Sequence, residues 1–171
     1  GYNPNLQVRP YDTGKSKQVI AAAQADGVNT DVPVTIYFRS GQFARITELA
    51  EAVSGMLNEV GFKTKVQALE ASVYAVVWRQ KPFPGDKLGI NSHGNELGDL
   101  STTARYYRCD QGASAFCDPK VDQMEVKARE ATGETRAKLY QEVQAYMYDQ
   151  EATIPVGRML SYYGLSKRLE W

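Results

Sequence analysis

The chain has 171 residues, a mass of 19.0 kDa, and 20 basic side chains against 20 acidic ones. Apolar residues make up 43% and charged residues 23%, which is typical of a globular domain and excludes a disordered tail. The zero net charge gives no overall basic field, so nucleic acid is not expected as a partner, and no apolar run approaches the ~20 residues that cross a bilayer.

The N-terminal part of the chain predicts a short helix followed by a strand. Asp12 or Thr13 can cap a helix that runs to about Ala25, and Gly27 supplies the left-handed residue that ends it. Residues 32–38 then alternate between apolar and polar side chains, which is the period of a strand with one buried face.

The next segments complete a strand–helix–strand unit. Apolar residues recur at helical spacing over residues 46–60, and residues 63–69 alternate again. We therefore expect a parallel βαβ unit with a right-handed crossover. A third helix is expected over about residues 71–80, and a short strand follows near residues 88–91.

The second half of the chain predicts a long loop and then two helices. Residues 92–116 are expected to be mostly loop, and loops of this length are commonly functional. Asp118 is a suitable N-cap with Pro119 at the first helical position. The other expected elements are a helix end near residue 131, a second helix over 134–151, and terminal strands at 154–156 and 159–165.

Few residues carry a recognisable catalytic pattern. The chain has no phosphate-binding loop, no dinucleotide fingerprint and no nucleophile elbow. Its sole histidine, His93, is followed at intervals of three by Glu96 and Asp99, a set that a hard or borderline cation would accept. The pattern leaves two interpretations open, a metal-dependent site and a solvated, glycine-containing loop.

The two cysteines, Cys109 and Cys117, are eight residues apart and lack the further ligands of a zinc site. A disulfide between them would close a loop of roughly nine residues and contribute about 2.5 kcal/mol to stability. Such a bond requires an oxidising compartment, whereas two free thiols would fit a cytosolic protein. We favour the disulfide.

The expected topology brings several polar residues to one edge of the sheet. Arg39 ends the first predicted strand and is followed by Ser40, Gly41 and Gln42, while the loop from Ser92 follows the third strand. Ligands of open α/β sheets bind beyond the carboxyl ends of the strands. Tyrosines such as the pair at 106–107 could stack on a ligand there, or simply be buried with their hydroxyls at the surface.

Segments along the whole chain resemble one family when they are taken in order. SHGNELGD at 92–99 is similar to a GWxADYxDP loop, and FCDPKVD at 116–122 is similar to an FSNPEVDxL helix start. Their order and spacing resemble the peptide/nickel-type (family 5) extracellular solute-binding proteins of ABC importers. The segments that carry this resemblance are residues 11–37, 48–63, 92–99, 116–122, 136–140, 154–155 and 163–169.

This resemblance implies a fold and a function. The fold would be α/β, a periplasmic-binding-protein-like lobe with a small, mainly parallel sheet flanked by helices. Residues 1–171 would form a single domain, the C-terminal ligand-binding lobe of a longer two-lobe protein. That protein would deliver a small solute, an oligopeptide or related compound, to the membrane permease of an ABC transporter. It would be no enzyme, would need no cofactor, and would lie in the periplasm or outside the cell, free or tethered to the membrane.

The resemblance also assigns roles to the loop at 92–99. Glu96 would take the place of the acidic residue that meets a ligand amine, and His93 the place of a pocket tryptophan. His93 could hydrogen-bond a ligand or coordinate a metal that the ligand carries. The alternative is a small metal-dependent hydrolase using His93, Glu96 and Asp99. The predicted ligand-binding residues are Arg39, Ser40, Gly41, His93, Asn95, Glu96 and Asp99.

Overall fold

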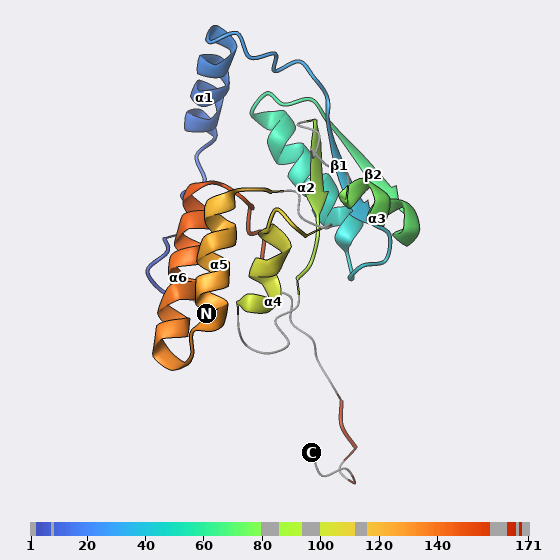
Figure 1. Cartoon of the computed structure of the whole chain (residues 1–171). Helices are drawn as coiled ribbons and strands as arrows, with labels where there is room; N and C mark the ends of the chain where they lie inside the picture. The colour runs from blue at the N-terminus through green and yellow to red at the C-terminus, as the bar shows by residue number, and fades with distance from the viewer. Residues whose placement is uncertain are drawn as a thin grey trace.

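A three-stranded parallel sheet and six α-helices make up the part of the chain that the computed structural model describes (Figure 1). None of the helices in this part has the length and apolar character needed to cross a membrane. The described residues are 3–7, 9–79, 86–93, 100–111, 116–157, 164–166 and 168.

The sheet confirms the predicted βαβ unit. Its strands are β1 (Val34–Arg39), β2 (Thr64–Leu69) and β3 (Lys87–Ile90), in the order β2-β1-β3 with both pairs parallel. Helix α2 (Ile46–Glu59) connects β1 to β2. The expected α/β class with a small parallel sheet is therefore confirmed.

One face of the central strand packs against α2. Ile36 and Phe38 of β1 are buried together with Ile46 and Ala50 of α2. The period of two in the strand and the period of about 3.6 in the helix place these apolar residues opposite one another. Helix α3 (Ala71–Trp78) also contacts β1. We call the three strands with α2 and α3 the sheet half.

The remaining helices form a second unit with its own core, which we call the helical half. It contains α4 (Ser101–Ala104), the 3₁₀ turn η1 (Arg105–Tyr107), α5 (Pro119–Glu130) and α6 (Gly133–Asp149), and α5 and α6 lie side by side (Figure 1). As predicted, the Asp118 side chain caps α5 by accepting from the backbone N–H of Lys120. The core consists of the buried residues Ala104, Ala128, Tyr140 and Val143.

The N-terminal segment follows the helical half before the chain enters α1 (Thr13–Ala25). The backbone N–H of Asn3 donates to Oε1 of Gln144, and its side chain donates to the carbonyl of Gln141 in α6. The predicted cap of α1 is present, since Asp12 accepts from the backbone N–H of Lys15. Helix α1 has no buried residue and stands apart from the sheet in Figure 1.

One prediction about the second half of the chain was wrong, and another was incomplete. Residues 154–156 form no strand: Ile154 is 75% exposed, Val156 is 56% exposed, and no described strand pairs with them. A strand needs a partner for its backbone groups, and alternation alone does not supply one. Most of the second predicted strand, 159–165, lies outside the described residues. The segment 92–116, expected to be mostly loop, also contains α4 and η1. Ala104 of α4 is buried in one core with Ala128 of α5, and this burial stabilises a turn of low helix propensity.

Candidate functional site

A cleft of about 390 Å³ lies beyond the carboxyl ends of β1 and β3. Arg39 ends β1, residues 91–93 follow β3, and Tyr106 reaches the cleft from η1. The cleft therefore receives residues from both the sheet half and the helical half. Its described lining consists of Arg39, Ala71, Tyr74, Ala75, Trp78, Arg79, Asn91, Ser92, His93 and Tyr106.

Helix α3 supplies one wall of the cleft. Ala71, Tyr74, Ala75 and Trp78 are three or four residues apart, so they lie on a single helical face. The rings of Tyr74 and Trp78 stack with centroids 5.8 Å apart and planes at 19°. The Tyr74 hydroxyl donates to the carbonyl of Ile90 at 2.9 Å, which fastens this wall to the end of β3.

Gly89 has no side chain, which allows the Trp78 indole to lie directly against the backbone of β3. A Cβ atom at this position would clash with Cζ3 and Cε3 of the Trp78 indole. Any side chain at residue 89 would therefore displace the Trp78 ring. Gly89 is thus required by the position of an aromatic wall rather than by its own backbone angles.

The His93 ring contacts the rings of two tyrosines in η1. Its ring centroid lies 5.0 Å from that of Tyr106 and 6.0 Å from that of Tyr107. Burial lowers the pKa of His93 from its ordinary value of 6.5, because a charged imidazole loses its hydration there. The ring is therefore neutral at pH 7, so one nitrogen can accept a hydrogen bond or bind a metal carried by a ligand.

The turn after β1 and the segment after β3 are joined through Gln42. Its Nε2 donates to Oδ1 of Asn91 at 2.6 Å and to Oγ of Ser92 at 3.0 Å. Its Oε1 is buried and accepts from no residue in the described part of the chain. The backbone N–H of Ser40 donates to the carbonyl of Leu69, and Gly41 adopts a left-handed φ of 68°.

Only some of the predicted site residues line the cleft. Arg39 and His93 line the cleft, whereas Ser40 and Gly41 form the adjacent turn and are not among its described lining. The other three predicted residues lie outside the described part of the structure: Asn95, Glu96 and Asp99. Within the described residues, no three His, Cys, Asp or Glu side chains are grouped to hold a metal ion.

The described lining is positively charged. It contains two arginines, Arg39 and Arg79, and no carboxylate, and neither arginine forms an ion pair with a described residue. Arginine presents a planar fork of donors that suits carboxylate groups. Arg79 was not predicted as a site residue. A charged residue just after a helix ordinarily faces solvent, and the residues around Arg79 form no recognisable motif.

A disulfide joins Cys109 to Cys117 next to η1, with the two Cα atoms 4.5 Å apart. We predict that replacing both cysteines with serine lowers the free energy of unfolding by about 2.5 kcal/mol, because the closed loop restricts the unfolded chain. Urea denaturation of the oxidised chain and of the double variant measures the difference. The oxidised chain treated with a thiol reductant serves as the control and should match the variant. An unchanged midpoint in both would contradict the prediction.

Comparison with known proteins supplies two relatives by sequence. The chain is 27% identical over 177 residues to heme-binding protein A of Haemophilus influenzae, with 99% of the chain and 31% of that protein aligned. It is 25% identical over 166 residues to di/tripeptide-binding protein 4 of Pseudomonas aeruginosa, covering 91% of the chain and 30% of that protein. The chain thus spans about 30% of the length of these relatives. No protein-family model matches the sequence.

Solved structures share the fold. The ABC transporter substrate-binding protein CtaP of Listeria monocytogenes superposes with a TM-score of 0.71 at 16% identity, over 88% of this chain and 30% of that one. NikA of Staphylococcus aureus, solved with a nickel–histidine complex, shares the fold with a TM-score of 0.69 at 11% identity, over 86% of this chain and 31% of that one. The relatives are thus named as heme- and di/tripeptide-binding proteins, and the structural neighbours include peptide- and nickel-binding ones, which confirms the resemblance seen in the sequence motifs.

Proposed function

We propose that the chain is the C-terminal, ligand-binding lobe of a solute-binding protein of an ABC importer, and that the cleft is its half of the binding site. The observation that carries this proposal is the position of the cleft, beyond the carboxyl ends of two parallel strands in a fold shared with substrate-binding proteins. An alignment over nearly the whole chain with 31% of a binding protein supports the assignment to one lobe.

The lining favours a solute that combines negative charge with a flat apolar surface. Arg39 and Arg79 suit carboxylates, while Trp78, His93 and Tyr106 offer ring faces for stacking. A peptide with an aromatic side chain and a C-terminal carboxylate has these properties. A planar macrocycle with carboxylate arms has them too, and one relative is named as a heme-binding protein.

The partners and location follow from this role. The second lobe of the full-length protein would close on the solute, and a membrane permease would receive it. We infer a periplasmic or extracellular location, which the Cys109–Cys117 disulfide supports because such bonds persist in oxidising compartments. The hydrolase alternative depends on Glu96 and Asp99 acting with His93, and the two relatives are named as binding proteins.

The proposal is tested by titrating full-length protein with hemin and with an aromatic tripeptide, after mass spectrometry of any solute that co-purifies. Arg39→Ala is expected to raise the Kd of the bound solute roughly 10- to 150-fold, since a hydrogen bond to a charged group contributes about 1.5 to 3 kcal/mol. Isothermal titration calorimetry measures the change.

Arg129→Ala is the matched control, because Arg129 is exposed on α5 and lines no part of the cleft. It should bind as the unchanged protein does. Equal affinity of the Arg39 and Arg129 variants would contradict the assignment of the cleft. Turnover of a bound solute that His93→Ala abolishes would favour the hydrolase instead.

A further inference from the structure

We propose that Glu125 and Asp122 of α5 are positioning residues, which hold η1 so that the rings of Tyr106 and Tyr107 stay in contact with the His93 ring at the cleft. This inference rests on the proposed function only for its consequence on solute binding. The contact itself is a property of the chain without ligand.

The upstream end of η1 is fixed by apolar packing. Ala104, which directly precedes η1, is fully buried in the core of the helical half. Its backbone N–H donates to the carbonyl of Leu100, which also packs against that core. One residue lies between the buried Ala104 and Tyr106, and two lie between Ala104 and Tyr107.

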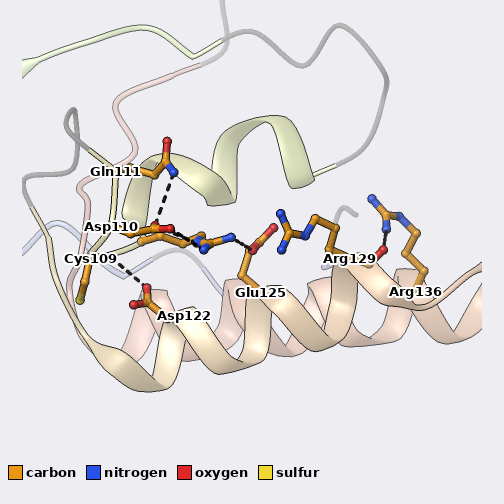
Figure 2. A network of polar contacts seen from close by, with 8 residues as sticks. Cys109, Asp110, Gln111, Asp122, Glu125, Arg129 and Arg136 are labelled. Carbon is orange, nitrogen blue, oxygen red and sulfur yellow. Dashed lines mark hydrogen bonds and ion pairs between the residues drawn. The ribbon is translucent and has the colours of Figure 1, made fainter.

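The downstream end of η1 is fixed by polar contacts to α5 (Figure 2). Nη1 of Arg108 donates to Oε2 of Glu125 at 3.0 Å, and the backbone N–H of Cys109 donates to Oδ1 of Asp122 at 2.9 Å. Asp122 and Glu125 are three residues apart, so both carboxylates lie on the face of α5 that meets η1. The disulfide from Cys109 to Cys117 adds a covalent tie to the N-terminus of this helix.

The Glu125 carboxylate is committed to this contact. Its side chain is 2% exposed and that of Arg108 is 15% exposed, so both charged groups have lost most of their hydration. The ion pair between them compensates for this loss. Arg108 also binds Asp110, at 2.6 Å between Nη2 and Oδ2. Asp110 is 54% exposed and belongs to the same loop as Arg108, so its contact ties the loop to itself and not to α5.

The consequence concerns how the two halves of the lobe meet. The sheet half and the helical half have separate cores, and His93 lies after β3 whereas both tyrosines lie in η1. The ring contacts between His93 and the tyrosines thus cross the junction at the cleft. By fixing η1, α5 sets the position of the Tyr106 wall relative to His93.

The sole histidine of the chain provides a direct readout, because its ring protons give isolated NMR resonances that the ring currents of Tyr106 and Tyr107 displace. In Glu125→Ala, we expect the His93 resonances to move most of the way to the positions of an unstacked histidine. In the matched variant Asp110→Ala, which also removes a partner of Arg108, they should stay in place. Far-UV circular dichroism verifies that each variant is folded.

Unchanged His93 resonances in folded Glu125→Ala, or an equal displacement in Asp110→Ala, would overturn the inference. If Glu125→Ala does not fold, Asp122→Ala decides by the same criterion, because it removes only the acceptor of the Cys109 N–H. Titration of full-length Glu125→Ala with hemin and with the aromatic tripeptide, compared with the unchanged protein, then tests the consequence separately. Displaced resonances with unchanged affinity for whichever of these solutes the unchanged protein binds would reject the proposed function of the cleft and leave the positioning role intact.

Discussion

The 171-residue chain alone is expected to bind its solute about a thousandfold more weakly than the full-length protein does. All described residues that line the cleft belong to this chain and come from β1, the C-terminal end and face of α3, η1 and the segment after β3. If this lobe supplies half of a binding free energy of about −8 kcal/mol, a Kd of about 1 µM becomes about 1 mM. The chain spans about 30% of its relatives, so the other contacts would come from the remaining part of the protein.

Isothermal titration calorimetry of both proteins with the same solute measures this difference. A thermal melt of the chain must first show a cooperative transition, so that weak binding is not the result of misfolding. Equal affinities of the two proteins would reject the two-lobe site.

Phe38→Ala is expected to lower the free energy of unfolding of the sheet half by about 3 to 5 kcal/mol. The Phe38 ring is 1% exposed and packs in the core that β1 forms with α2, so its removal leaves a cavity. An effect of this size is comparable to the whole stability of many small domains. Urea denaturation followed by tryptophan fluorescence measures it, since Trp78 belongs to the sheet half.

Phe62→Ala is the matched control, because it removes the same side chain at a position that is 38% exposed. Its cost should be much smaller, since less apolar surface is lost from the interior. The helical half has its own buried core, so its circular dichroism should persist at urea concentrations where the Phe38 variant has lost the sheet. Equal destabilisation by the two variants would show that Phe38 is not a core residue.

Local signals in the sequence predicted the regular elements well. The caps at Asp12 and Asp118 act through their own backbone neighbours, and the apolar period of α2 depends on residues within one helix. The parallel βαβ unit follows from the order of these elements, and so does the edge at which Arg39 and the segment after β3 meet. The order of motifs along the chain was sufficient to indicate the family of relatives.

Other features depended on partners that are distant in sequence. Residues 154–156 alternate like a strand, but the described chain places no strand beside them. A turn as short as α4 is stable because Ala104 packs against another helix. Arg79 lines the cleft because the last turn of α3 lies there, a fact that no neighbouring residue signals.

The sequence by itself therefore determined the α/β class, the helices and strands of the βαβ unit, and the sheet edge beyond which the cleft lies. Hydrogen bonds within one helix and alternation within one strand act over a few residues, so the sequence records them directly. Only the tertiary structure decided that Glu125 is buried against Arg108 and that His93 meets Tyr106 and Tyr107. Burial of a charge and contacts between rings depend on which surfaces meet, and this is set by packing between elements that are distant in the sequence.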